Sequence, residues 1–314
     1  MCSLEGLYLG DNLAIMRGLA AESVDLGYAD PPFFSQRNYY QLDAGGRESA
    51  KPAKPAFSDN WFWDDASELS LRRITTPDFT PQCLDLMEGL VKVLGRGGLA
   101  AYLLNQLERI NELHRLLKPS GSFYLHCDPT ASHYLKLILD SVFIPRGGVF
   151  VNEIIWHYRK WAVAKRKFSA NHDVIFFYAK SPNYCFNLQY QDRAPSTLKT
   201  FGTKKIISAV DEKGRRIPSR TSDAESAGVK MADVWPISII APVAKQRLGY
   251  PTQKPEALLE RIILASSNPA DLVLDIYCGS GTTVAVAARL GRRWLGIDNN
   301  PDAIAMSKER VGKL

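Results

Sequence analysis

The 314-residue sequence is poor in cysteine, with five widely spaced residues and no C-x-x-C pair. A disulfide framework and a zinc knuckle both need closely spaced cysteines, so the sequence supports neither. His126-Cys127-Asp128 followed by His133 offers metal-ligating groups. Neighbouring side chains on a strand point to opposite faces, however, so no metal site is expected there.

Long apolar runs are also missing. No segment approaches the roughly 18–20 apolar residues that a membrane span requires, and Met1–Gly6 lacks the basic and then apolar regions of a signal peptide. The composition is globular, at 46% hydrophobic and 23% charged residues. We therefore expect a cytoplasmic protein without membrane contact, whose length allows one large domain with a smaller insertion.

The whole chain has a net charge of +6, and the positive charge is concentrated in one segment. Residues 151–245 hold sixteen Lys and Arg against eight Asp and Glu, whereas the remaining residues hold 23 basic against 25 acidic side chains. A local basic excess suits a polyanion, so nucleic acid is the first partner to consider. A solubilising basic face is the alternative.

The hydrophobic pattern predicts an α/β fold. Strands are expected near 6–11, 24–29, 122–127, 152–158, 173–178, 271–275 and 293–297, and helices near 12–19, 99–117, 132–143, 255–266, 282–290 and after Pro301. This alternation implies a Rossmann-like, mostly parallel sheet with helices on both faces. Residues 35–80 are interpreted as a long functional loop. Residues 182–245 are polar and basic without a strong period, which indicates a small domain or an extended insertion.

A glycine turn lies near the C-terminus, in the run Asp275-Ile276-Tyr277-Cys278-Gly279-Ser280-Gly281-Thr282-Thr283. It follows a strand and opens a helix, so the backbone can approach a ligand closely. The turn lacks the Lys of a phosphate-binding loop, and Val284 stands where a dinucleotide motif needs a small residue. Asp298 ends the next strand, where an acid can accept hydrogen bonds from ribose hydroxyls. The pattern favours a nucleoside ligand without a pyrophosphate, such as S-adenosyl-L-methionine.

A second motif, Asp30-Pro31-Pro32-Phe33, ends an early hydrophobic strand. Two prolines make the turn rigid and stop the strand. An exocyclic amine on a base is a poor nucleophile because its lone pair is delocalised into the ring. If its two N–H bonds donate to Asp30 and to the Pro31 carbonyl, the nitrogen can pyramidalise, while Phe33 stacks on the base. The alternative interpretation is a plain strand-terminating turn.

Together the two motifs resemble the β group of S-adenosylmethionine-dependent DNA amino-methyltransferases, the N6-adenine and N4-cytosine family. That group has D-P-P-[YF] early, a target-recognition region next and F-x-G-x-G late, as here, and the resemblance covers nearly the whole chain. The run Tyr250-Pro251-Thr252-Gln253-Lys254-Pro255 is similar to the family segment H-P-T-Q-K-P, with Tyr for His. Tyr277 replaces Phe and keeps the ring, whereas Ile276 stands where many members have Pro.

The resemblance implies the circularly permuted methyltransferase order of the fold. It divides the chain into a catalytic first part at 1–181, a target-recognition region at 182–245 and a cofactor-binding second part at 246–314. Catalysis is assigned to Asp30, Pro31, Pro32 and Phe33. Cofactor binding is assigned to Asp11, Thr252, Lys254, Asp275, Tyr277, Gly279, Gly281, Thr282 and Asp298. The expected reaction is direct in-line methyl transfer to a flipped base, because the catalytic turn contains no cysteine for a covalent route.

Double-stranded DNA is the expected partner, and a homodimer is left open. Most contacts are expected to be with phosphates, and few with base edges. The expected residues lie in a loop between two strands and in the irregular region, and are Arg159, Lys160, Lys165, Arg166, Lys167, Lys204, Lys205, Arg215, Arg216 and Arg220.

Alternative functions differ in substrate. Asp30 and Phe33 favour N6-adenine by resemblance, because Ser-Pro-Pro is the more typical N4-cytosine form. A methyltransferase for protein glutamine or RNA is the second alternative. The third is a non-enzymatic DNA-binding protein on a relic fold. The recognition sequence and any accompanying restriction enzyme cannot be predicted from the residues.

Overall fold

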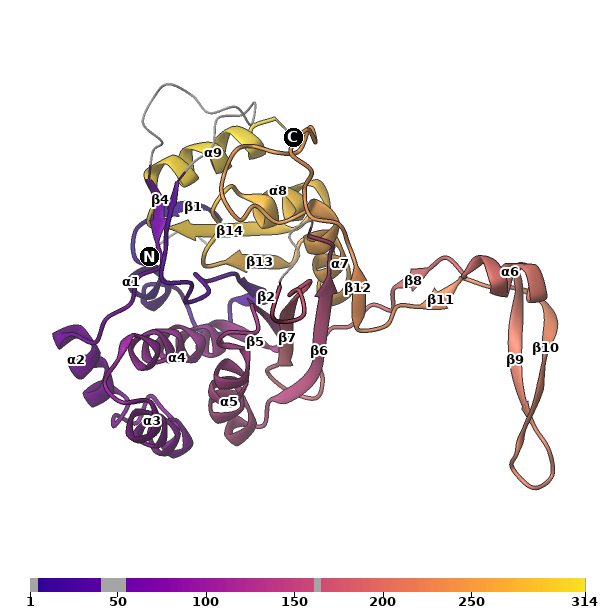
Figure 1. Cartoon of the computed structure of the whole chain (residues 1–314), viewed down its shortest axis with the longest axis horizontal. Helices are drawn as coiled ribbons and strands as arrows, with labels where there is room; N and C mark the ends of the chain where they lie inside the picture. Colours follow the sequence, from indigo (N-terminus) through magenta and orange to yellow (C-terminus); the bar gives the residue numbers. More distant parts are fainter. Residues whose placement is uncertain (1–4, 41–54, 161–164, 314) are drawn as a thin grey trace. The chain divides into compact units, whose positions relative to one another are not determined.

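In the computed structural model, which describes residues 5–40, 55–160 and 165–313, an eight-stranded sheet organises the larger of two compact units. This unit comprises Met1–Phe186 and Asp233–Leu314, and the smaller unit comprises Asn187–Ala232 (Figure 1). No helix in these described ranges is long and apolar enough to cross a membrane. Residues 41–54 of the predicted loop lie outside the described residues.

The sheet has the order β1-β14-β13-β2-β5-β7-β6-β12, and only β7 runs antiparallel to its neighbours. Its strands are β1 (Gly6–Leu9), β2 (Val24–Ala29), β5 (Leu117–Cys127), β6 (Val149–His157), β7 (His172–Ala179), β12 (Val234–Pro236), β13 (Leu272–Asp275) and β14 (Arg293–Asp298). The mostly parallel order confirms the predicted fold class. The late strand β13 lies beside the early strand β2, as the permuted order requires.

Helices cover both faces of the sheet (Figure 1). One apolar core lies between the sheet and the group α1 (Asn12–Arg17), α3 (Pro81–Leu94), α4 (Gly98–Leu116) and α5 (Ser132–Phe143). The other core lies beneath α7 (Glu256–Ser266) and α8 (Thr282–Arg289), while α9 (Pro301–Val311) packs near β1 and β14. On β5 the alternation sends Phe123 and Leu125 to the first core and Tyr124 to the second.

The prediction of an irregular segment over 35–80 is wrong in part. It contains the hairpin strands β3 (Asn38–Tyr40) and β4 (Pro55–Ser58) and the helix α2 (Asp65–Arg73). No residue of α2 is buried, so it carries no apolar period, although Asp64 and Ser67 form a capping box at its start. Helix α3 was also missed, despite an N-cap at Thr80 and Pro81 in its first turn.

The smaller unit lies within the segment predicted to recognise the target, but its bounds are narrower than 182–245. Val234–Pro236 pairs with β6 and belongs to the large sheet. The unit contains β8 (Tyr190–Gln191), α6 (Pro195–Phe201), β9 (Lys204–Val210), β10 (Arg216–Glu225) and β11 (Val229–Lys230). Its hairpin β9–β10 is largely exposed on both faces, which explains why the sequence shows no strong period there.

Candidate active site

The two sequence motifs meet at one edge of the sheet, although they lie about 245 positions apart in the sequence. Strands β2 and β13 are parallel neighbours, with Asp275 paired with Tyr28. Parallel strands present their carboxyl ends at the same edge. The catalytic turn that follows β2 therefore lies beside the glycine turn that follows β13.

A cavity of about 450 Å³ opens between these turns. This volume lies in the usual range for a small-molecule site. The predicted residues that line it are Asp11, Asp30, Pro31, Pro32, Phe33, Thr252, Lys254, Asp275, Tyr277, Gly279, Thr282 and Asp298. The sequence thus identified twelve of the 29 residues that line the cavity, from segments scattered over almost the full chain.

Gly281 differs from this prediction, because it is not among the residues that line the cavity. Its φ of +75° is in the left-handed region, and an added Cβ would approach the backbone Cα of Ser307 to 2.9 Å. Gly281 is therefore explained by close packing of the turn against α9, not by approach to a ligand.

Two carboxylates on the cofactor side of the cavity are held by backbone amides. Asp298 accepts a 2.9 Å hydrogen bond from the Gly279 N–H and another of 2.9 Å from the Asn300 N–H. Asp275 accepts from the Tyr277 N–H at 2.9 Å. Burial raises the pKa of the Asp298 carboxyl above its ordinary value and raises that of Asp275 to about 7. Both carboxyls would gain from a cationic ligand.

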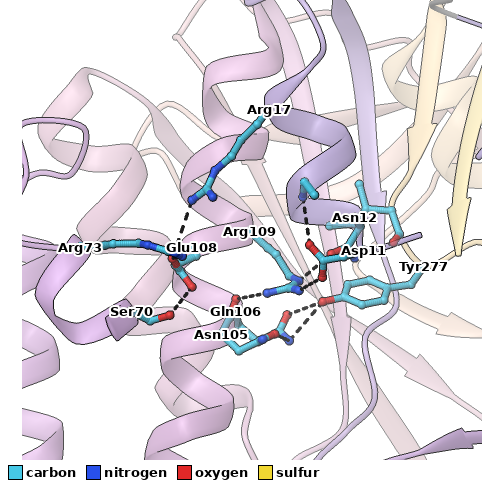
Figure 2. A network of polar contacts seen from close by, with 12 residues as sticks. Asp11, Asn12, Arg17, Ser70, Arg73, Asn105, Gln106, Glu108, Arg109 and Tyr277 are labelled. Atoms are coloured by element: carbon cyan, nitrogen blue, oxygen red, sulfur yellow. Dashed lines mark hydrogen bonds and ion pairs between the residues drawn. The ribbon is translucent and has the colours of Figure 1, made fainter. Parts of the chain in front are cut away.

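Helix α4 completes this side of the cavity, which the sequence did not predict (Figure 2). Arg109 donates to Asp11 at 2.6 Å and to Asn12 at 2.6 Å. Asp11 also caps α1 by accepting from the Ala14 N–H at 2.9 Å. The hydroxyl of Tyr277, absent from the Phe of the resembled motif, lies 3.3 Å from the Gln106 amide nitrogen (Figure 2). Arg109 therefore fixes Asp11 at the cavity wall.

Asp30 has one occupied and one unoccupied carboxylate oxygen. Its Oδ2 accepts from the Lys254 ammonium, which also donates to the Thr252 carbonyl at 3.3 Å. Its Oδ1 is buried and has no hydrogen-bond partner among the described residues. The sequence assigned Lys254 to cofactor binding, but its observed side-chain contact is with the Asp30 carboxylate. A buried acceptor at the cavity wall requires a donor, which a bound amine supplies.

Asp59 is a further residue that the sequence did not identify. It is fully buried and accepts from the Phe34 N–H at 3.1 Å, the Ser35 N–H and the Trp61 indole N–H at 2.8 Å. Phe34 has a φ of +60°, a conformation that costs a non-glycine residue about 1–3 kcal/mol. The hydrogen bonds to the Asp59 carboxylate therefore stabilise the unfavourable backbone conformation of Phe34, next to Asp30-Pro31-Pro32-Phe33.

We predict that Asp59→Asn lowers the single-turnover rate of methyl transfer about tenfold, because the amide offers one acceptor oxygen to three donors. The rate is measured with a labelled methyl donor, and thermal unfolding is recorded in parallel. Asp65→Asn, an exposed carboxylate on α2, is the control. A folded Asp59→Asn protein with a rate within twofold of wild type would contradict the positioning role.

The residues predicted to contact DNA lie in both units, and some of them form ion pairs with nearby acidic side chains. In the larger unit, Arg159, Lys160 and residues 165–167 are exposed between β6 and β7. In the smaller unit, Lys204 pairs with Glu225 at 2.8 Å and Arg215 pairs with Asp211 at 2.8 Å. The other predicted contacts in that hairpin, Lys205, Arg216 and Arg220, are exposed without an ion pair among the described residues.

No group of three or more His, Cys, Asp and Glu side chains arranged to hold a metal ion occurs in the described parts of the chain. Four acidic and two basic side chains line the cavity, namely Asp11, Asp30, Asp275, Asp298, Arg109 and Lys254. An acidic excess disfavours a pyrophosphate and suits a nucleoside that carries a sulfonium cation. Fold and cavity together define an α/β methyltransferase that uses S-adenosyl-L-methionine.

Comparisons with known proteins identify the family. Residues 24–309 match the N6/N4 DNA methylase family model, so the chain belongs to the DNA methylase family. It is 35% identical to the type II methyltransferase M.HpaI of Haemophilus parainfluenzae over 211 residues, which cover 67% of this chain and 59% of that protein. It is 29% identical over 304 residues to the DNA adenine methyltransferase YhdJ of Escherichia coli K12, covering 96% of this chain and 81% of that protein.

Two solved structures share the fold. An M1.HpyAVI–SAM complex has a TM-score of 0.53 at 17% identity and covers 98% of both chains. The PvuII DNA methyltransferase, described as cytosine-N4-specific, has a TM-score of 0.56 at 17% identity, covering 98% of this chain and 86% of that one. At such low identity these similarities speak for the fold alone.

Proposed function

We propose that the protein methylates the exocyclic N6 amine of adenine in double-stranded DNA, with S-adenosyl-L-methionine as the methyl donor. The observation that carries this proposal is the carboxylate of Asp30, a residue of the cavity wall whose Oδ1 is buried and has no hydrogen-bond partner among the described residues. An N–H of the target amine fits this acceptor. The second N–H would donate to the Pro31 carbonyl, so that the nitrogen presents its lone pair away from the turn.

The other groups at the turn would orient the base and the carboxylate. Lys254 fixes Asp30 through Oδ2 and leaves Oδ1 without a hydrogen-bond partner among the described residues, so that Oδ1 would accept from the substrate. Phe33 is half-buried at the cavity wall, where its ring can stack on a base that has left the helix. The cofactor, when bound, supplies an electrophilic methyl group on its sulfonium. The chain's own contribution is to hold the amine in line with that group.

Two observations support adenine over cytosine as the target. Position 30 carries Asp, whereas the N4-cytosine enzymes of the resembled family more typically carry Ser at that position. The relative that covers 96% of the chain is named a DNA adenine methyltransferase. For DNA, the exposed basic side chains of 159–167 and of the β9–β10 hairpin supply phosphate contacts, with the smaller unit as the proposed target-recognition region.

The product distinguishes the candidate substrates. We expect N6-methyladenine when the protein is incubated with unmethylated genomic DNA and the methyl donor, and the DNA is digested to nucleosides for mass spectrometry. N4-methylcytosine alone would overturn the choice of base. Methyl transfer to RNA or protein but not to duplex DNA would overturn the choice of substrate. Sequencing of the modified positions then gives the recognition site.

A further inference from the structure

A fully buried histidine lies directly behind the catalytic carboxylate. His126 belongs to β5 and has no exposed surface. Its Nδ1 is 3.0 Å from the Tyr28 hydroxyl and 3.7 Å from Asp30 Oδ1, and its Nε2 is 3.2 Å from Asp173 Oδ2. Asp173 in turn accepts from the Tyr158 hydroxyl at 2.7 Å. The proposed methyl transfer does not by itself require any of these contacts.

The hydrogen bonds fix which ring nitrogen carries a proton. A carboxylate accepts only, so His126 Nε2 must donate to Asp173. Burial raises the pKa of the Tyr28 hydroxyl well above its ordinary value, so Tyr28 stays protonated. In the neutral ring, Nδ1 therefore keeps a lone pair and accepts from Tyr28. This lone pair belongs to the nitrogen that lies nearest to Asp30 Oδ1.

Asp30 alone is poorly suited to keep a proton. Its Oδ2 already accepts from the Lys254 ammonium, so Oδ1 is the oxygen left to take a proton. An imidazole is intrinsically a stronger base than a carboxylate. A proton that reaches Asp30 Oδ1 can therefore move on to the His126 imidazole.

We propose that His126 receives, through Asp30, the proton that the target amine sheds on methylation; this inference rests on the proposed function. When the amine nitrogen bonds to the methyl carbon, the bond from that carbon to sulfur breaks and the nitrogen becomes positively charged. One N–H then passes its proton to Asp30 Oδ1, which restores a neutral amine. Asp30 passes a proton to His126 Nδ1 and becomes a carboxylate again, while the Tyr28 oxygen turns to accept from the new N–H.

The surroundings of the ring stabilise its charged form. Asp173 faces one nitrogen and Asp30 the other, so an imidazolium lies between two carboxylates. Burial alone would raise the pKa of Asp173, but the hydrogen bonds from His126 and Tyr158 help to lower it below its ordinary value. The rings of Phe33 and Trp156 lie 5.4 Å from the imidazole and keep water away. The titratable groups that face the ring are Tyr28, Asp30 and Asp173, and behind them Tyr158 donates to Asp173 and Lys254 pairs with Asp30.

The test compares His126→Gln with wild type in single-turnover methyl transfer to unmethylated duplex DNA across pH. A Gln amide can still donate to Asp173 but cannot take up a proton. The wild-type rate should fall at low pH, because a protonated His126 ring cannot accept a further proton. His126→Gln should be slower by about 100-fold and should lose this low-pH fall. A rate within twofold of wild type, or a slower rate with the low-pH fall retained, would overturn the inference.

Asp173→Asn is the second variant, and it keeps the volume and an acceptor oxygen. Without the carboxylate the imidazolium is less stable, so the low-pH fall of the rate should move to lower pH. An unchanged pH profile contradicts the proposal, even if His126→Gln fails to fold.

His114→Gln is the matched control, since His114 is also buried but lies away from the cavity. Burial lowers the pKa of His114 to about 3, so its replacement should leave the profile unchanged. A wild-type protein that transfers no methyl group to DNA refutes the proposed function instead.

Discussion

Asp30→Ala is expected to lower the rate of methyl transfer to DNA by about 1,000-fold or more, with cofactor binding retained. In the proposed reaction Asp30 holds the amine through Oδ1 and takes its proton, so its loss removes both an acceptor and a base. The carboxylate lies on the proposed base side of the cavity, whereas Asp275 and Asp298 lie on the proposed cofactor side. Single-turnover assays with a labelled donor measure the rate, and equilibrium dialysis measures cofactor affinity.

The control for this variant concerns Lys254, whose side chain is only 8% exposed and would lose its carboxylate partner. An unpaired buried ammonium destabilises the fold, so a loss of rate could arise from misfolding. The double variant Asp30→Ala/Lys254→Met removes this charge and should be equally inactive. Asp30→Asn keeps an acceptor oxygen and should retain more activity than Asp30→Ala. Methyl transfer by Asp30→Ala at a tenth of the wild-type rate would refute the role of Asp30.

The sequence predicted the parts of the site that depend on strand ends. Asp30 and the glycine turn each follow a buried hydrophobic strand, and the parallel sheet brings such ends to one edge. The prediction that Asp298 ends the next strand is confirmed, because β14 closes at that residue. These features follow from local pattern and from chain order, so a single sequence suffices to find them.

The sequence could not reveal site residues that act across the sheet or that lie in segments without a regular hydrophobic pattern. Arg109 lies on α4 among other buried residues, and nothing local marks it as a cavity residue. His126 was weighed only as a metal ligand, because its neighbours in sequence are Cys127 and Asp128. Its partners Tyr28 and Asp173 come from the adjacent strands β2 and β7, and strand pairing had to be known first. Asp59 follows a hairpin that carries no apolar alternation.

Asp298→Ala is expected to weaken S-adenosyl-L-methionine binding by about 1,000-fold. Hydrogen bonds from two ribose hydroxyls to a carboxylate contribute about 1.5–3 kcal/mol each, and 1.4 kcal/mol corresponds to a tenfold change in Kd. Both carboxylate oxygens already hold a backbone N–H, from Gly279 and Asn300, and retain lone pairs for the ribose. Calorimetric titration of the full chain with the cofactor measures the Kd.

The matched control is Asp25→Ala, because Asp25 also accepts from a backbone amide, that of Leu272 at 2.8 Å, and pairs with Lys118. It lies at the opposite edge of the same sheet, away from the cavity. Loss of either carboxylate leaves a backbone donor without its acceptor, and both variants should unfold at a lower temperature than wild type. Only Asp298→Ala should lose cofactor affinity. A Kd within threefold of wild type in that variant would contradict the ribose role and would leave Asp298 as a brace for the glycine turn.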